Sequence, residues 1–260
     1  MNTPREALES LVVLNCRQLK LSGLRSTFPA LVREATELDK SPLEFLNSCL
    51  SEELRVRQEH VLQSRLKTAK FREAKTLAGF DFTAIPDLPR QRITALADAS
   101  FVKEKSNVIC LGPSGTGKTH IATALGMAAL EAGYKVRFTG VVKLVQELLL
   151  AQSEYHLPRY LKTWDKYDLV VLDELGYIGL GAGGPLLFQF CAERYERGSL
   201  IVTTNLEFSR WTEVFGEPGL TTALLDRITH HAEVLVFSGE SYRFKESKRR
   251  VKQPTAIPAP

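Results

Sequence analysis

The stretch NVICLGPSGTGKT, residues 107–119, decides the fold class of this chain. NVICL is a short apolar run typical of a buried strand, and an apolar helical pattern follows the glycine-rich segment. This segment satisfies the pattern G-x-x-x-x-G-K-[ST] through Gly112, Gly117, Lys118 and Thr119. The same pattern between a strand and a helix predicts a phosphate-binding loop.

The chemistry of phosphate binding explains these residue types. Glycines let the backbone N–H groups face a β-phosphate, and the N-terminus of the following helix adds positive potential. Lys118 supplies a positive charge to the β- and γ-phosphates, and Thr119 supplies a hydroxyl ligand for Mg²⁺. The predicted nucleotide-binding residues are the loop and the start of the helix: Gly112, Pro113, Ser114, Gly115, Thr116, Gly117, Lys118, Thr119 and His120.

Apolar strands alternate with helical patterns from residue 106 onward. The predicted strands after the loop are KVRFTG, DLVVLDE, SLIVTTN and EVLVFSG, at residues 135–140, 168–174, 199–205 and 233–239. Helical patterns separate them, and this alternation predicts a mainly parallel sheet with helices on both faces. The fold class is therefore expected to be α/β.

Two carboxylates follow the apolar part of DLVVLDE, at the strand end where open α/β sheets bind ligands. We expect Asp173 to hold Mg²⁺ through water and Glu174 to orient or deprotonate an attacking water. A glutamate after the metal-binding aspartate favours hydrolysis over phosphate transfer to a metabolite, as in a small-molecule kinase. SLIVTTN ends in Thr203, Thr204 and Asn205, and a polar side chain there is expected to reach the γ-phosphate or the water.

The first part of the chain shows helical patterns without the alternating apolar strands of the later part. Residues 5–75 show helical spacing with few breakers, which predicts a small module of three or four helices. The stretch GFDFTAIPDLP, residues 79–89, is typical of a linker or clamp. The predicted organisation is a helical domain at 1–75, a linker at 76–105, a nucleotide-binding core at 106–246 and a basic, proline-rich tail at 247–260.

Composition and charge narrow the class of protein. No apolar run approaches the length of a membrane span, no signal peptide is apparent, and the four cysteines form no C-x-x-C pair. These features predict a cytoplasmic protein with buried free thiols and no membrane partner. Residues 55–75 hold seven positive and two negative side chains, which suit either a polyanion partner or a solvated helix face.

The motifs in this order resemble those of the AAA+ ATPases. With the surrounding text DELGYIGL, AERYERGSLIVTTNL and LTTALLDRITHHAEVLVFSGESYRFK, the chain looks like the IstB family, the helper ATPases of insertion-sequence transposons. That family is related to the helicase loader DnaC and the initiator DnaA. The resemblance covers roughly residues 10–250 and implies an AAA+ core, with ATP and Mg²⁺ as cofactors.

The resemblance also assigns roles to single residues. GPSGTGKT matches the Walker A motif and LVVLDE the Walker B motif, so Lys118 and Glu174 are expected catalytic residues. Asn205 matches sensor 1, which is also expected to act in catalysis. Arg227, in LLDR, matches the arginine finger, and Arg243, in GESYR, matches sensor 2. We expect Arg227 to act in trans on the nucleotide of a neighbouring subunit. Because the tail is short, we expect no C-terminal helical lid of the kind found in many AAA+ proteins.

The implied partners are duplex DNA, a transposase of the DDE type and further copies of the chain, in a bacterial cell. Oligomerisation on target DNA, with deformation of that DNA, is the expected activity; a DnaC-like helicase loader is the alternative. No base-reading motif is present, so we expect largely sequence-independent binding. The candidate DNA-contacting cations are Lys143, Arg159, Lys162, Arg65, Lys67 and Lys70.

Overall fold

The computed structural model describes residues 4–239 and 241–242, and these residues divide into two compact units. The units comprise Met1–Ser64 and Arg65–Pro260. The division lies inside helix α3 (Pro42–Ala69), earlier than the boundary predicted at residue 75. Residues after Ser64 belong to the second unit because the backbone and side chains of residues 68–71 pack on its sheet.

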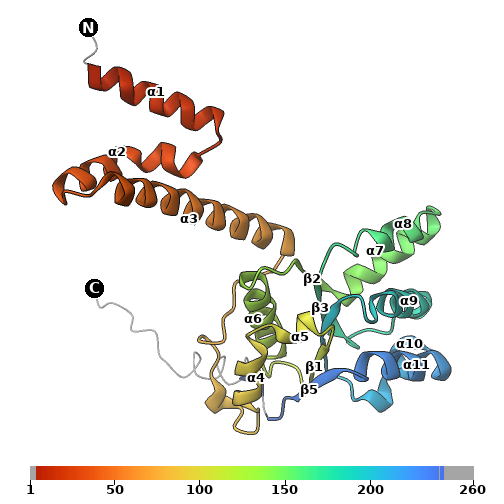
Figure 1. Ribbon diagram of the computed structural model, residues 1–260. Coiled ribbons are helices and arrows are strands. Elements are labelled where there is room, and N and C mark those ends of the chain that lie inside the picture. Colours follow the sequence, from red (N-terminus) through yellow and green to blue (C-terminus); the bar gives the residue numbers. More distant parts are fainter. Residues whose placement is uncertain (1–3, 240, 243–260) are drawn as a thin grey trace, which may run out of the picture. The chain divides into compact units, whose positions relative to one another are not determined.

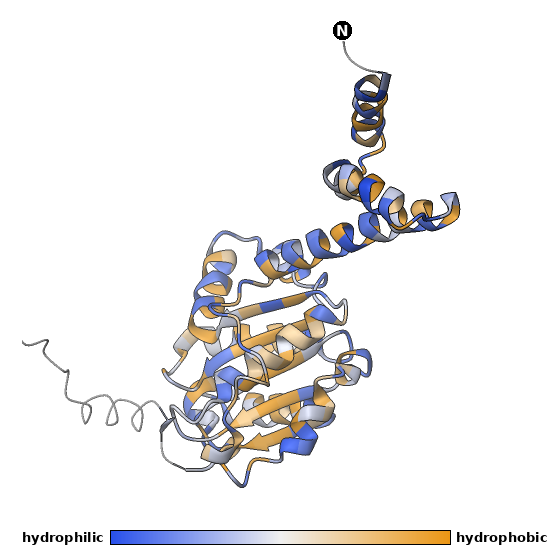
Figure 2. Ribbon diagram, turned by 90° about the vertical axis from the view of Figure 1, so that its left-hand side faces the viewer, coloured by the Kyte–Doolittle hydropathy of each residue, from blue (hydrophilic) through white to orange (hydrophobic). Residues whose placement is uncertain are grey.

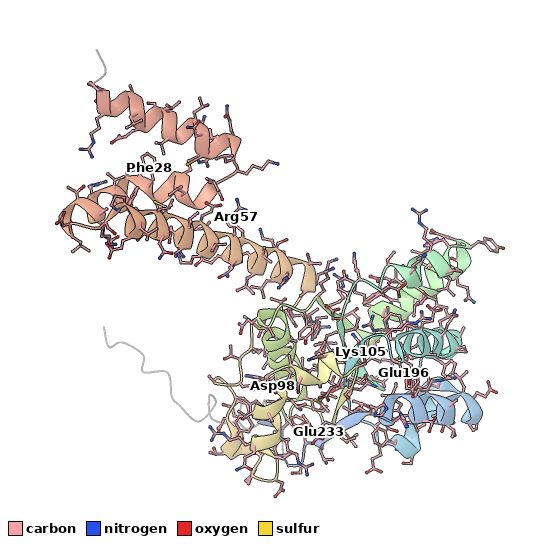
Figure 3. All side chains as sticks on the ribbon, viewed as in Figure 1. Phe28, Arg57, Asp98, Lys105, Glu196 and Glu233 are labelled. Carbon is pink, nitrogen blue, oxygen red and sulfur yellow. The ribbon has the colours of Figure 1, made fainter. Side chains whose placement is uncertain are left out.

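The first unit consists of helices α1 (Pro4–Gln18), α2 (Ser22–Glu37) and the larger part of α3 (Figure 1). The three helices confirm the helical module predicted from spacing. Phe28 is buried in this unit together with Cys16 and Cys49 (Figure 3). A capping box begins α3, since Ser41 Oγ accepts the N–H of Glu44 while the Glu44 carboxylate accepts the N–H of Ser41.

The second unit is built on a five-stranded sheet whose strands all run parallel, in the order β2-β3-β4-β1-β5. The strands are β1 (Asn107–Leu111), β2 (Val136–Gly140), β3 (Leu169–Leu175), β4 (Ser199–Thr204) and β5 (Ala232–Val236). Each lies within or beside the apolar run that predicted it. The predicted α/β class, with a parallel sheet between helices, is confirmed.

Helices cover both faces of the sheet. Figure 1 shows α4 (Arg90–Leu96), α5 (Ser100–Lys103) and α6 (Lys118–Glu131) on one side. On the other side lie α7 (Val141–Ser153), α9 (Gly184–Arg194), α10 (Thr212–Phe215) and α11 (Pro218–Thr229), with α8 (Leu157–Lys162) following α7. The short helices α4, α5, α8 and α10 were not predicted, because four to seven residues are too few to show a helical period.

The core lies between the sheet and these helices. β3 and β4 are almost wholly buried, as expected for strands covered on both faces. Figure 2 shows the strands of the sheet as mainly hydrophobic. All four cysteines are buried and unpaired, which confirms the predicted free thiols. Burial raises the pKa of Cys110 and of Cys191 to about 12, so both thiols stay protonated at neutral pH. No helix in the described ranges is long and apolar enough to cross a membrane.

Candidate nucleotide site

The predicted phosphate-binding loop connects β1 to α6 at the carboxyl edge of the sheet. Gly117, the residue before α6, has φ +91°, and a Cβ at this position would lie 2.6 Å from the Phe80 ring. Gly115 has φ +79°, and a Cβ there would overlap the hydroxyl of Ser241. Both positions therefore need glycine for their backbone conformation and for the close approach of another segment.

Lys118 begins α6 and is 4% exposed, unusual burial for a lysine. Its Nζ donates to the backbone carbonyls of Gly112, at 2.6 Å, and Pro113, at 2.7 Å. The ammonium is thus held inside the curl of the loop by neutral acceptors. A phosphate entering the loop would replace these carbonyls with a charged acceptor, which gives a stronger hydrogen bond.

Asp173 lies at the carboxyl end of β3 and is fully buried. Its Oδ1 accepts hydrogen bonds from Thr119 Oγ1, at 2.9 Å, and from Thr203 Oγ1, at 2.7 Å. In the described part of the chain its Oδ2 has no hydrogen-bond partner. An unpartnered buried carboxylate oxygen is costly, and a hydrated cation would satisfy it.

This donor set fits Mg²⁺. Asp173 and Thr119 offer oxygen ligands, and among the described residues no cluster of three or more His, Cys, Asp or Glu could form a complete metal cage. Mg²⁺ is usually bound by one or two protein oxygens, with waters and substrate phosphates as its other ligands. The geometry of Asp173 and Thr119 is therefore that of a site completed by the nucleotide.

Glu174 follows Asp173 and adopts φ +66°, a left-handed conformation that is uncommon for residues other than glycine. The ladder between β3 and β4 shifts register between Leu172 and Leu175, which places this strained residue in the irregular part of the strand. The backbone N–H of Glu174 donates to Thr203 Oγ1 at 2.9 Å. Its side chain lines the nucleotide pocket and is 42% exposed there, as a residue acting on water would be.

The polar end of β4 contacts the acids through Thr203. One hydroxyl donates to Asp173 and accepts from Glu174, so it fixes both predicted acids to β4. Asn205, the residue that matches sensor 1, is exposed just beyond the strand. Its role toward a γ-phosphate stays a prediction, whereas Thr203 makes the contacts seen between these strands.

A pocket of about 560 Å³ lies over the phosphate-binding loop. One wall comes from the linker, where Phe80 packs against Gly117 and lies 5.2 Å, centroid to centroid, from the ring of His120. His120 Nε2 lies 2.9 Å from the carbonyl of Thr76. Phe80 in the linker therefore packs on the core and also lines the pocket.

The end of the chain returns to the same loop. The backbone N–H of Tyr242 donates to the carbonyl of Gly115 at 3.0 Å, and Tyr242 lines the pocket. Arg243, the residue that matches sensor 2, lies outside the described residues.

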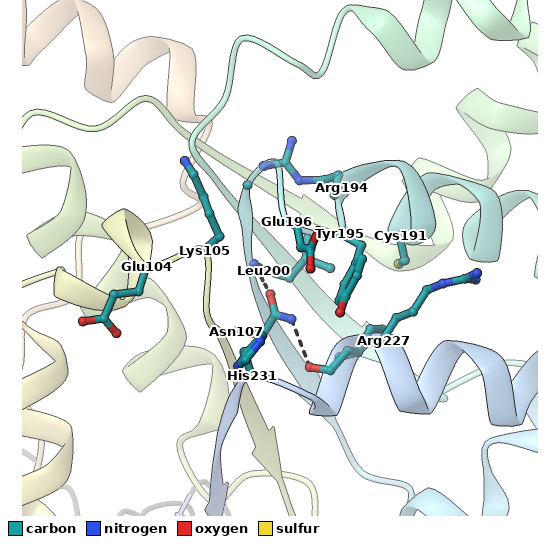
Figure 4. Close-up of a pocket in the computed structure, with 12 residues that line it drawn as sticks. Glu104, Lys105, Asn107, Cys191, Arg194, Tyr195, Glu196, Leu200, Arg227 and His231 are labelled. Atoms are coloured by element: carbon teal, nitrogen blue, oxygen red, sulfur yellow. Dashed lines mark hydrogen bonds between the residues drawn. The ribbon is translucent and has the colours of Figure 1, made fainter.

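Arg227 lies at the opposite edge of the sheet. It is in the last turn of α11, which leads into β5. Ala232 at the start of β5 pairs with Asn107 at the start of β1, so this turn lies at the amino edge of the sheet. A strand rises about 3.3 Å per residue, so the five residues of β1 keep Arg227 more than ~10 Å from the loop that follows β1. Its guanidinium carbon lies 5.3 Å from the centroid of the Phe188 ring, beside a cavity of about 250 Å³ (Figure 4).

The candidate DNA-contacting cations are found at two places in the second unit. Lys143 lies in the first turn of α7, and Arg159 and Lys162 in the last turn of α8; all three are exposed. Arg65 and Lys67 lie in the final turns of α3, and Lys70 follows that helix. Nothing in the structure joins these residues into one site.

Comparison with known proteins identifies the chain. Residues 14–250 match the family described as "IstB-like ATP binding protein". The chain belongs to this family. It is 39% identical to the insertion sequence IS21 putative ATP-binding protein of Pseudomonas aeruginosa, over 93% of this chain and 91% of the relative. It is 37% identical to the IS5376 putative ATP-binding protein of Geobacillus stearothermophilus, over 90% of this chain and 93% of the relative.

Solved structures agree with this IstB-like assignment. The crystal structure of the DnaC helicase loader has a TM-score of 0.50 and 25% identity, and the similarity covers 57% of this chain and 88% of that one. AMPPCP-bound DnaA of Aquifex aeolicus has a TM-score of 0.54 and 17% identity, over 72% and 57% of the two chains. The first similarity supports the expected relation to DnaC, and the second shows the shared fold. The IstB-like chain is thus an ATP-binding protein.

Several residues that line the pocket were not predicted from the sequence, and two of them are polar groups near the loop or the acids. Arg72 and Tyr177 both line the pocket, and neither belongs to a phosphate-binding motif. Tyr177 lies just after β3, and its hydroxyl is 3.4 Å from Ser114 Oγ. Its place in GYIGL directly after the two acids was a usable signal, because the carboxyl end of a parallel strand faces the ligand.

Proposed function

We propose that this IstB-like protein hydrolyses ATP and, as an oligomer on duplex DNA, assists a partner transposase. The observation that carries the hydrolytic part is the arrangement around Asp173. One oxygen of its carboxylate accepts from Thr119 and Thr203, the other is unpartnered among the described residues, and Glu174 follows it at the pocket wall.

In the proposed reaction Lys118 neutralises charge on the β- and γ-phosphates, and the loop amides bind the β-phosphate. Asp173 and Thr119 would hold Mg²⁺, which supplies charge neutralisation between the phosphates when bound. Glu174 orients the attacking water and accepts its proton. Thr203 keeps the backbone of Glu174 and the carboxylate of Asp173 in a fixed relation.

The position of Arg227 supports an oligomer with shared nucleotide sites. Arg227 lies in the last turn of α11, near the amino edge of the sheet and away from the loop of its own chain, and its guanidinium stacks on Phe188. We propose that it contacts the nucleotide of a second copy. An arginine finger contributes about 10³–10⁵ in turnover in phosphoryl-transfer enzymes. We therefore propose that an isolated copy turns ATP over slowly and that assembly completes the site.

The two relatives named above are proteins of insertion sequences, and this setting supports DNA and a transposase as the proposed partners. In this proposal Lys143, Arg159 and Lys162, or Arg65, Lys67 and Lys70, contact DNA phosphates. Affinity would then come from the backbone and from DNA deformability.

The experiment that tests this proposal is electron microscopy of the full chain with duplex DNA, with and without ATP and with and without the transposase of the same element. We expect ordered assemblies on duplex DNA that require ATP and that recruit the transposase. Single copies under all of these conditions would contradict the proposal.

A helicase-loading ATPase is the second candidate, and the similarity to the DnaC structure favours it. The two candidates differ in the nucleic acid that they bind. A loader should prefer single strands, and a transposition helper should prefer duplexes. Measuring affinities for a duplex and for one of its strands at the same salt concentration separates the two.

A further inference from the structure

Arg72 contributes an arginine to the nucleotide pocket from outside the phosphate-binding motifs. Its Nη2 lies 3.9 Å from Oε2 of Glu174, the proposed water-orienting residue. The same nitrogen is 3.4 Å from the position that a Cβ would take on Gly140, at the end of β2. Gly140 at the end of β2 pairs in register with Asp173 at the end of β3. The guanidinium of Arg72 therefore lies near the carboxyl ends of these two strands.

The backbone that leads to Arg72 is fixed on the second unit. Ala69 is fully buried, and the carbonyl of Thr68 accepts a hydrogen bond from Arg137 Nη1 at 3.1 Å. The Phe71 ring lies 5.9 Å, centroid to centroid, from that of Phe138, and fills a notch at Gly126, where a Cβ would lie 3.1 Å from it. These contacts keep Arg72 beside Glu174 even though its own side chain is 64% exposed.

Arg72 is also one of five basic residues between positions 65 and 75, of which the last, Lys75, pairs with Glu73. Arg65, Lys67 and Lys70 precede it, and in the described part of the chain none of these three has a carboxylate within 4.0 Å. A nucleic-acid backbone bound to these residues would bring phosphates to an exposed guanidinium whose present partner is one carboxylate oxygen. A phosphate and Glu174, which forms an ion pair at 3.9 Å, would then compete for the same guanidinium.

We propose that Arg72 is a positioning residue that holds the Glu174 carboxylate, and that nucleic-acid phosphates on residues 65–72 release it by competing for the guanidinium. This inference rests on the proposed function, because it assumes DNA binding and a hydrolytic role for Glu174. It makes residues 65–72 the connection between DNA binding and ATP turnover. Coupling between two binding events is reciprocal. If bound DNA weakens the contact between Arg72 and Glu174, then that contact must also weaken DNA binding.

Reciprocity gives a test that needs no ATP. The affinity of the nucleotide-free, full-length protein for a fluorescein-labelled duplex is measured by anisotropy at low salt for the wild type, Glu174→Gln, Arg72→Gln and the double variant. We expect Glu174→Gln to bind the duplex about two- to five-fold more tightly, the size set by a weak, exposed ion pair. This increase in duplex affinity should disappear when Glu174→Gln is combined with Arg72→Gln, because the ion pair between the two residues is already absent.

A matched control separates this pair from general charge effects. Glu131→Gln removes an exposed carboxylate at the end of α6 and should change duplex affinity equally with and without Arg72. If Glu174→Gln behaves like Glu131→Gln in both backgrounds, the restraint by Arg72 is contradicted. If the wild type binds the duplex only with ATP, the release step in the nucleotide-free protein is contradicted. If it binds no duplex with ATP either, the proposed function fails as well.

Steady-state turnover gives the second readout. Without DNA, Arg72→Gln should raise kcat about two- to five-fold with little change in KM for ATP, and Arg72→Lys should keep most of the restraint. Lys103→Gln, an exposed charge on α5, should leave both constants unchanged. A lower kcat with a higher KM in Arg72→Gln would make Arg72 a phosphate ligand and overturn the proposal.

Discussion

At the scale of single residues, the hydroxyl of Thr203 connects β4 to both acids of the nucleotide site. Thr203 is 1% exposed, and its hydroxyl has two partners on β3. Thr203→Val keeps the shape and strand preference of the side chain but removes both hydrogen bonds. Because this leaves a buried carboxylate with fewer donors, we expect a loss of about 1–3 kcal/mol in the free energy of unfolding.

Thermal and urea unfolding check this loss, and Mg²⁺-dependent ATP binding should weaken in the same variant. Thr222→Val is the matched control, because Thr222 is exposed on α11 and its hydroxyl bonds only within that helix. Equal stability of the two variants would mean that the Thr203 contacts contribute nothing.

Lys118 is the residue on which nucleotide binding depends most. Lys118→Ala removes the buried ammonium from the loop, so we expect ATP binding to be lost in calorimetric titration. Lys135→Ala, at an exposed lysine before β2, should bind ATP normally. Retained ATP affinity in Lys118→Ala would refute the role of this loop.

Glu174→Gln tests the proposed chemistry separately from binding. The amide keeps the size of the side chain but cannot accept a proton, so kcat should fall about 10²–10⁴-fold, the usual contribution of general acid–base catalysis. ATP affinity should stay close to that of the wild type. Near-normal hydrolysis would remove Glu174 from the mechanism.

The linker is the element whose role the structure sharpens most. Phe80 lies against Gly117, His120 and Phe82 and forms part of the pocket wall. We expect Phe80→Ala to weaken ATP binding about 2–10-fold, the size of an aromatic contact. Phe80→Leu should recover part of this loss, whereas an unchanged dissociation constant in Phe80→Ala would make the contact purely structural.

The elements themselves were largely predictable because each strand and long helix of the second unit has its own apolar period. The phosphate-binding loop and the acids after β3 were also predictable, since both follow local rules about strand ends. Arg72 was not. Its place depends on a reversal after Ala69, with Lys70 at φ +58°, and on the packing of Phe71 in the notch at Gly126, which no local pattern reports.

The same distinction explains the end of β4. The sequence marked a polar strand tip, but which of its three polar side chains reaches Asp173 depends on the register between β3 and β4. That register is irregular at Leu172 to Leu175, so counting residues along the strand does not settle which one makes the contact.

At the scale of the whole molecule, the charge pattern predicts how DNA affinity responds to salt. Affinity should fall linearly on a log–log plot as salt rises, with a slope of about −0.9 for each DNA phosphate contacted. Removing one such contact, as in Lys67→Gln, should reduce that slope by about 1 without changing sequence preference. A flat response to salt would contradict an electrostatic interface.

The central claim is that one ATP site needs two copies of the chain, since Arg227 lies across the sheet from the loop of its own copy. Mixing Arg227→Ala with Glu174→Gln tests it most directly, because each variant alone should be inactive. In a random one-to-one mixture about a quarter of the interfaces would pair an intact glutamate with an intact arginine. We predict that ATP turnover returns in the mixture with DNA present; no recovery at any ratio, in variants that still co-assemble, would contradict a shared site.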